Sequence, residues 1–193
     1  MARWWAQHHS LGLLDHPGTR CYAPPMERHF TVSGFVSQSG KTALHFHCIV
    51  NLWLPPGGHV EADEDPIQAV LREVLEETEI EVEVVSTGRA YEWVEPGRLA
   101  PPATIGVYNI PGDSHQREPH QHIDFVYFTR PVAGANLELP DAAEGWRWVS
   151  EDELRAGAPI ALPDGSGEAA VPEDVRTLAL DAIGAVRALE VGA

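Results

Sequence analysis

Residues 30–36 and 42–47 are strand-like, because the apolar residues Phe30, Val32, Leu44 and Phe46 alternate with polar ones, and Ser39 and Gly40 stand between the two segments. A strand directs successive side chains to opposite faces, so this alternation predicts two strands, and the short turn between them predicts a hairpin. The same kind of pattern predicts further strands at about residues 81–85, 91–94, 104–109, 122–129 and 146–149.

Three other segments are typical of helices. Residues 2–14 carry spaced apolar side chains, residues 150–154 have the composition of a helix start, and residues 172–189 place an apolar stripe on one side. A loop rich in glycine and proline, residues 157–171, precedes the last of these helices. Strands that are interrupted by helices in this way indicate the α/β class.

A fourth helix, over residues 66–78, has the clearest start signal. Asp65 is a suitable N-cap, and Pro66 fits the first helical position because its missing N–H costs nothing there. Gln68 stands three residues after the cap, where its side chain completes a capping box. The apolar residues that follow recur with helical spacing, so this helix is predicted to pack through one face.

Glu73, Glu76 and Glu77 share an arc of roughly 100° on the opposite face of this helix. Two carboxylates four residues apart destabilise a helix by roughly 0.2–0.5 kcal/mol, and the helix dipole also disfavours negative charge near this end. Just upstream, the sequence Pro-Pro-Gly-Gly at residues 55–58 lets backbone carbonyls approach an ion closely. Because hard cations such as Mg²⁺ prefer oxygen ligands, the pattern predicts a divalent-metal site, with a solvated acidic face as the alternative.

Eight residues around this helix match the Nudix box at every spacing: Gly58, Glu64, Arg72, Glu73, Val74, Glu76, Glu77 and Ile80. The chain therefore resembles the Nudix hydrolases, over about residues 29–155. One position departs from the family pattern, because Glu79 stands where the family has a glycine that ends the helix in a left-handed conformation. A side chain there costs roughly 1 kcal/mol, so either Glu79 tolerates the strain or the helix ends differently.

The resemblance implies an α/β/α sandwich in which a mixed β-sheet lies between helices. It divides the chain into an N-terminal helical extension, residues 1–28, and a Nudix domain, residues 29–156. A loop and C-terminal helix, residues 157–193, would pack on the same domain. The extension is expected to pack either on this core or on a second subunit. In the second case the chain would form a homodimer.

The resemblance also implies a set of metal ligands. Carried over by position, Glu73, Glu76 and Glu77 bind Mg²⁺ or Mn²⁺ together with the carbonyl oxygen of Gly57. In many members a water that is activated by metal and a glutamate attacks one phosphorus of a diphosphate. Glu77 and Glu73 are both candidates for the catalytic base, and the sequence does not choose between them.

Three further box residues have supporting roles by the same resemblance. Arg72 is expected to orient Glu73 and belongs to the catalytic group. Glu64 is expected to brace the loop before the helix by pairing with Arg72, and Gly58 to support the turn of the box.

Later segments carry additional candidates. Glu144 lies in a segment that resembles the one from which family members add a metal-binding acid, and Glu118, Asp124 or a plain surface role for Glu144 are the alternatives. His120, His122 and Asp124 share one face of a predicted strand. In the family this strand borders the substrate cavity, so His122 and Asp124 are predicted to contact substrate, with a half-exposed polar face as the alternative.

Aromatic residues offer rings that could stack on a nucleobase, and Trp53 is the candidate that we select, with a place in the core as the alternative. Pro96 follows the box at a spacing that resembles the proline of members that cleave ADP-ribose. His45 and His47 alternate next to Cys48, but no further ligand of matching spacing follows them, so we interpret them as lining a sheet face rather than as a soft-metal site.

Composition limits the classes of molecule that the chain is expected to bind. The chain of 193 residues carries 13 basic and 29 acidic residues, a formal charge of −16. Long nucleic acids bind through lysine and arginine, so this balance argues against them as partners and favours a small nucleotide whose charge bound cations offset. No apolar run is long enough for a membrane span, and two cysteines without a repeated spacing predict no disulfide framework, so we expect a cytoplasmic protein.

The expected function is that of a metal-dependent pyrophosphohydrolase that cleaves a diphosphate linkage in a nucleoside triphosphate or an ADP-ribose-like nucleotide sugar. One alternative is a non-catalytic, regulatory nucleotide-binding module with the same fold, which is disfavoured because it would not need to keep Arg72 and the three glutamates. A second is an isomerase of isoprenyl diphosphates, for which Cys48 would have to serve and which nothing nearby supports.

Overall fold

A computed structural model of the protein describes residues 26–192, apart from residues 90–94, 96, 114, 141–144 and 163. The helix expected at residues 2–14 and the strand expected at residues 91–94 lie outside the described residues. Pro96 and Glu144 lie outside them as well.

The centre of the fold is an eight-stranded mixed sheet. Its strands are β1 (Arg28–Gln38), β2 (Lys41–His47), β3 (Leu52–Leu54), β4 (Gly57–His59), β5 (Val82–Val85), β6 (Thr104–Ile110), β7 (His120–Pro131) and β8 (Trp146–Ser150). β1 and β7 run parallel, whereas the other pairs are antiparallel. The order is β3-β2-β1-β7-β5, with β4 added to β1, β6 to β7 and β8 to β2. A separate short ribbon joins β9 (Ile160–Ala161) to β10 (Glu168–Ala169).

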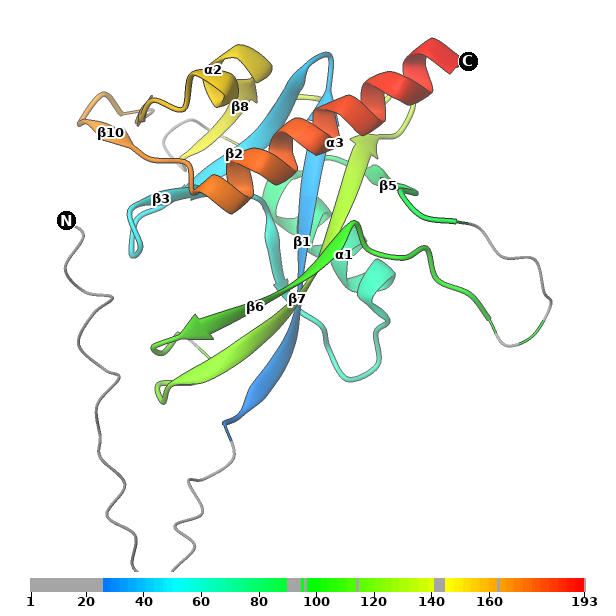
Figure 1. Ribbon diagram of the computed structural model, residues 1–193, viewed down its shortest axis with the longest axis vertical. Coiled ribbons are helices and arrows are strands. Elements are labelled where there is room, and N and C mark those ends of the chain that lie inside the picture. Colours follow the sequence, from blue (N-terminus) through cyan, green and yellow to red (C-terminus); the bar gives the residue numbers. More distant parts are fainter. Residues whose placement is uncertain are drawn as a thin grey trace, which may run out of the picture.

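Two helices cover opposite faces of this sheet. In Figure 1, α3 (Glu173–Gly192) crosses in front of β1 and β7, and α1 (Pro66–Thr78) lies behind them. Each helix seals its own apolar core: Phe35 and Phe128 pack with the α3 side chains, and Val32 packs with those of α1. The short helix α2 (Glu151–Ala156) lies against α3. These layers confirm the expected α/β fold with a mixed sheet between helices.

The hairpin expected at the start of the domain is confirmed. β1 and β2 pair next to their connecting turn, where Ser37 faces Thr42. Ser39 and Gly40 have φ angles of 45° and 73°, so both adopt the left-handed conformation that a tight two-residue hairpin requires. Glycine meets this requirement at no steric cost, which is why the turn signal is visible in the sequence.

Helix α1 begins and ends where the sequence predicts. The Asp65 side chain accepts hydrogen bonds from the N–H groups of Ile67 and Gln68, and the Gln68 side chain accepts one from the N–H of Asp65. At the other end, Glu79 adopts the left-handed conformation (φ 59°, ψ 13°) and donates its N–H to the carbonyl of Leu75. Of the two alternatives for the missing family glycine, Glu79 therefore tolerates the strained conformation.

Two short strands of the sheet, β3 and β4, have no counterpart among the predicted strands. Gly57 and Gly58 belong to β4, which pairs with Ser33 and Val32 of β1. A Cβ added to Gly57 would lie 2.1 Å from the backbone oxygen of Val32, so only glycine allows this close approach. Among the described residues, no helix is both long and apolar enough to cross a membrane.

Candidate functional site

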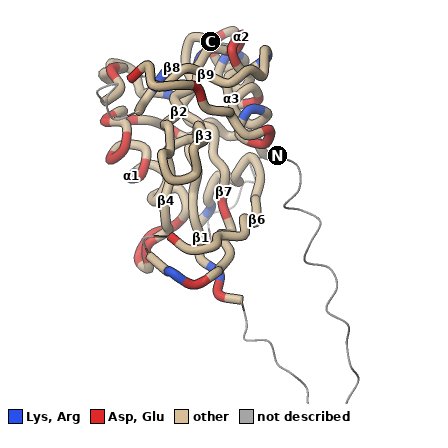
Figure 2. The backbone as a smooth tube through the Cα atoms, turned by 90° about the vertical axis from the view of Figure 1, so that its left-hand side faces the viewer, with Lys and Arg blue, Asp and Glu red and all other residues tan. Residues whose placement is uncertain are grey.

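The last two turns of α1 carry the acidic face. Figure 2 shows acidic residues gathered on this helix and on the loop before it. The side chain of Glu73 is 15% exposed, whereas that of Glu76 is 60% exposed, so the face runs from a half-enclosed position out to solvent. Val70 and Val74 on the opposite side are fully buried against the sheet, which fixes the direction in which the carboxylates project.

Arg72 lies at the centre of these carboxylates. Its Nε and Nη2 donate to the two carboxylate oxygens of Glu64 at 2.6 and 2.8 Å. Its Nη1 donates to Glu73 Oε1 at 2.7 Å and to Glu76 Oε2 at 3.2 Å, and Nη2 also reaches the backbone oxygen of His59 at 3.1 Å. The expected pairing of Glu64 with Arg72 is confirmed, and one guanidinium ties the box loop to two of the three glutamates.

The glycines of β4 bring backbone close to the same carboxylates. The N–H of Gly57 donates to Glu77 Oε2 at 3.1 Å. A Cβ on Gly58 would lie 2.3 Å from Glu73 Oε1. Because Gly58 has no side chain, the carboxylate of Glu73 can occupy this space. Gly57, Gly58 and the acidic face of α1 therefore form one continuous oxygen-rich surface.

Glu77 differs electrostatically from an ordinary surface glutamate. Burial and, to a smaller extent, the neighbouring charges of Glu73 and Glu76 raise the pKa of Glu77 to about 7, although the hydrogen bond from the Gly57 N–H acts in the opposite direction. A carboxylate in this position is stabilised by nearby positive charge. A divalent cation would supply such charge.

The donors fit a hard divalent ion such as Mg²⁺ or Mn²⁺. Glu73, Glu76, Glu77 and the Gly57 carbonyl offer only oxygen atoms, which is the ligand type that these ions prefer. In the structure Arg72 holds Glu73 and Glu76, while the Gly57 N–H holds Glu77. All three carboxylates project from adjacent turns of one helix, so side-chain rotation is the movement that would bring them onto one ion.

A second polar cluster lies on the other face of the sheet. His122 of β7 stands directly beside His29 of the parallel strand β1, and His59 of β4 pairs with Thr31, two residues further along β1. His120 joins them from the same face of β7, and Asp113 reaches them from the loop between β6 and β7. Only the alternation of His120 and His122 was visible in the sequence. Strand register adds His29 and His59 to the cluster, and the loop between β6 and β7 adds Asp113.

Within the described part of the chain, two groups of three ligand-type side chains come within 4.8 Å of one another, and both belong to this cluster. One is Asp113, His120 and His122, and the other is His29, His59 and His122. Burial lowers the pKa of His59 to about 4, and burial together with the neighbouring His120 lowers that of His122. Both rings are therefore neutral at pH 7.

Two predicted substrate residues are buried. Asp124 is 5% exposed and accepts a hydrogen bond from the Thr31 hydroxyl at 2.9 Å, and burial raises its pKa. Trp53 is fully buried in the core under α3, where its indole N–H donates to the carbonyl of Ile160 at 3.4 Å. The prediction that Trp53 stacks on a nucleobase is wrong, because its ring has no exposed face.

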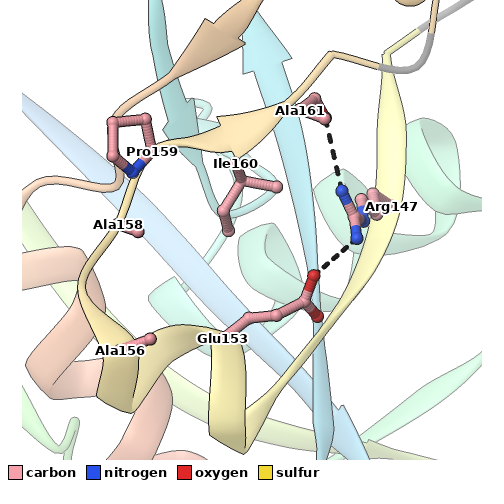
Figure 3. A pocket seen from close by; sticks show the side chains of 7 residues that line it. All are labelled: Arg147, Glu153, Ala156, Ala158, Pro159, Ile160 and Ala161. Carbon is pink, nitrogen blue, oxygen red and sulfur yellow. Dashed lines mark hydrogen bonds and ion pairs between the residues drawn. The ribbon is translucent and has the colours of Figure 1, made fainter.

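The remaining candidates lie apart from both clusters. His45 and His47 lie on one face of β2, Trp146 packs against His45, and Cys48 is exposed. A pocket of about 210 Å³ lies between α2 and β9, and in it Arg147 Nη2 donates to Glu153 Oε1 at 2.5 Å. Figure 3 shows the side chains that line this pocket. Arg147 is occupied by this contact, and no residue of the acidic surface lines the pocket.

Comparisons with known proteins match this chain to one protein family. A family profile described as the NUDIX domain matches residues 29–168. The chain is 33% identical over 147 residues to a zebrafish (Danio rerio) protein named m7GpppN-mRNA hydrolase NUDT17, a match that covers 70% of this chain and 43% of the relative. It is 36% identical over 72 residues to phosphatase NudJ of Escherichia coli K12, covering 36% of this chain and 47% of NudJ.

The chain thus spans less than half the length of either relative. Among solved structures, a NUDIX-family hydrolase from Clostridium perfringens superposes with a TM-score of 0.58 at 24% identity. That match covers 83% of this chain and 99% of the other. At this identity the likeness supports the fold alone, and the fold it supports is the sandwich that the sequence predicted.

Proposed function

The chain belongs to the Nudix family, and from this membership we propose that it is a metal-dependent hydrolase that cleaves a diphosphate linkage in a nucleoside diphosphate derivative. The observation that carries the proposal is the arrangement around Arg72. One guanidinium contacts Glu64, Glu73 and Glu76, beside a pair of glycines that leave room for their carboxylates. A helix whose glutamates served solubility alone would not need an arginine enclosed among them.

The ion would be held by Glu73, Glu76, Glu77 and the carbonyl oxygen of Gly57. When bound, a divalent cation lowers the pKa of a coordinated water and stabilises the negative charge of the phosphoryl oxygens. The protein's own part is to hold the carboxylates in position. Arg72 restrains Glu73 and Glu76 at 2.7 and 3.2 Å, and the N–H of Gly57 restrains Glu77 at 3.1 Å.

Glu77 is our candidate for the group that accepts the proton of the attacking water. Glu73 has one oxygen engaged by the Arg72 guanidinium, whereas Glu77 is held by a backbone N–H. A carboxylate whose pKa lies near 7 is suited to take a proton in the reaction and release it afterwards. Cation binding would lower that pKa, which keeps Glu77 ionised before the reaction begins.

For the substrate we propose a small nucleotide, either a nucleoside triphosphate or a nucleotide sugar. The zebrafish relative is named for an mRNA cap, but that name describes a protein more than twice as long as the matched region. The formal charge of −16 disfavours contact with a long RNA chain, because RNA binding relies on basic side chains. A small diphosphate can be bound through the cations alone.

The test is hydrolysis of a panel of nucleoside triphosphates, nucleotide sugars and capped dinucleotides with Mg²⁺ or Mn²⁺. The wild type should release product from at least one compound, and Glu77→Gln should lower turnover by roughly 10²–10⁴-fold, the usual effect of losing a general base. Glu81→Gln removes an exposed carboxylate just beyond α1 and should leave turnover unchanged. No hydrolysis by the wild type, or equal rates for Glu77→Gln, would instead favour a non-catalytic nucleotide-binding module.

A further inference from the structure

Four histidines and an aspartate meet where β1 and β7 begin, at the end of the sheet below α3 in Figure 1. The ring centroids of His29 and His120 are 4.8 Å apart, and those of His59 and His122 are 4.9 Å apart. Strand parity places His120 and His122 on the same face as Phe128, which packs under α3. The cluster therefore faces away from α1 and its glutamates.

Three atoms of the cluster form a compact triangle. His120 Nε2 lies 3.0 Å from His122 Nε2 and 3.2 Å from Asp113 Oδ2, and His122 Nε2 lies 3.2 Å from the same Asp113 oxygen. A tetrahedral ion with ligands at about 2.0–2.1 Å separates its ligand atoms by about 3.3 Å. The triangle thus has nearly the size of one face of a tetrahedral zinc site.

The hydrogen bonds around the triangle fix which atoms face its centre. His120 Nδ1 lies 2.9 Å from the carbonyl of Glu118, which can only accept, so Nδ1 carries the proton and Nε2 of the neutral ring presents a lone pair. Asp113 Oδ1 accepts the N–H groups of His115 and Gln116 at 2.8 Å each, which leaves Oδ2 toward the histidines. Histidine ligands of metals usually donate their second ring N–H to a carbonyl in this way.

Two of the three facing atoms, His120 Nε2 and Asp113 Oδ2, present lone pairs in a largely enclosed place, where a positive charge would stabilise them. The His120 side chain is fully buried, and those of His122 and Asp113 are 18% and 23% exposed. On the open side of the triangle, His29 Nδ1 and His59 Nε2 are buried and have no hydrogen-bond partner among the described residues. An orphaned ring nitrogen is available to bind an ion.

We propose that Asp113, His120 and His122 bind a second divalent ion of the zinc class, with His29 or His59 supplying the fourth ligand from its open side. Imidazole nitrogens favour zinc and similar transition metals, whereas the all-oxygen surface of α1 suits Mg²⁺ or Mn²⁺. The site joins the loop between β6 and β7 to the sheet. It does not depend on the proposed hydrolase activity, so either assignment can fail without the other.

β4 is the element that connects the two sites. Gly58 lies against Glu73 on one side of the sheet, and His59, the next residue, faces the histidines on the other. The backbone oxygen of His59 accepts a hydrogen bond from Arg72 Nη2 at 3.1 Å. An ion that the histidines bind would therefore also restrain β4, the strand that carries Gly57 and Gly58.

The experiment titrates the full chain, stripped with a chelator, with Zn²⁺ in competition with a chromophoric chelator, and records the visible spectrum with Co²⁺. The wild type should bind one equivalent of Zn²⁺ and give the intense absorption of tetrahedral Co²⁺. Asp113→Asn and His122→Gln should each weaken Zn²⁺ binding by at least about 100-fold and abolish that absorption, because each removes a ligand atom. Far-UV circular dichroism establishes that both variants are folded.

Two controls separate this site from other metal-binding groups. His47→Gln removes a histidine of β2 outside the cluster, and Glu76→Gln removes a carboxylate of α1, so both should bind Zn²⁺ like the wild type. The proposal is overturned if the wild type takes up no Zn²⁺, or if Asp113→Asn and His122→Gln bind it unchanged. Loss of binding in Glu76→Gln alone would also overturn it, because the ion would then belong to the acidic surface.

Discussion

Arg72 holds both carboxylate oxygens of Glu64, with Nε at 2.6 Å from one and Nη2 at 2.8 Å from the other. The two side chains are only 24% and 14% exposed, so water screens the pair weakly. This two-point contact leaves Nη1 free to engage Glu73 and Glu76. The loop before α1 and the acidic face of α1 therefore contact the same guanidinium group, that of Arg72.

Arg72→Lys tests this shared contact, because an ammonium group cannot make the two parallel hydrogen bonds of a guanidinium. We expect the variant to lose about 2 kcal/mol of unfolding free energy and a large part of its turnover. Arg130→Lys is the matched control, since Arg130 bonds Glu83 in an exposed pair that should contribute less than about 1 kcal/mol. Equal losses in urea unfolding for the two variants would contradict a special role for Arg72.

Glu79→Gly tests the strained helix end. Glu79 has a φ of 59°, a conformation that glycine adopts without the Cβ penalty of roughly 1 kcal/mol. The variant should raise the melting temperature by a few degrees and leave turnover nearly intact. Glu81→Gly, two residues on and not in the left-handed region, should lower the melting temperature instead. A large loss of turnover in Glu79→Gly would show that the side chain serves the site.

Gly58→Ala tests the close approach of β4 to the acidic face. The new methyl group would displace the flexible carboxylate of Glu73, which lies 2.3 Å from its position. We expect kcat/KM to fall by about 10²-fold, the usual effect of misplacing a catalytic group by about 1 Å, with little change in stability. Gly184→Ala, at an open position of α3, should gain about 0.5–1 kcal/mol and keep full activity. Unchanged kinetics in Gly58→Ala would mean that Glu73 is not needed where the structure places it.

The contact between α2 and α3 should make stability depend on acid pH. Hydrogen bonds from Arg187 and Arg155 lower the pKa of Glu151 to about 2. An unfolded glutamate titrates near its ordinary value, so the stabilisation is complete above that value and is lost as the pH falls toward 2. Urea unfolding of Glu151→Gln should show a deficit at pH 7 that shrinks below pH 4.5. A deficit that stays constant across this range would exclude the ionised pair as its cause.

Local signals explain what the sequence predicts well. The capping residues Asp65 and Gln68 act within one turn of helix, and Ser39 and Gly40 act within one hairpin, so neither feature needs knowledge of the rest of the fold. The family resemblance predicts the pairing of Glu64 with Arg72, because both residues stand at matching positions of the Nudix box.

Long-range pairing explains what the sequence does not reveal. β4 consists of two glycines and a histidine, which have no strand pattern, and it forms because β1 offers a free edge. His29 and His122 are neighbours only through the parallel register of β1 and β7. The burial of Trp53 is likewise decided by packing under α3, which its position beside the box does not disclose.

The central claim is that Glu73, Glu76 and Glu77 gather around a divalent cation. Crystals soaked in Mn²⁺ and measured for anomalous scattering test it most directly, because the signal locates the ion beside named side chains. The account predicts a Mn²⁺ peak within coordination distance of these carboxylates and of the Gly57 carbonyl, and its loss in Glu76→Gln. A well-ordered acidic face with no peak, or a peak at the histidine cluster alone, would contradict it.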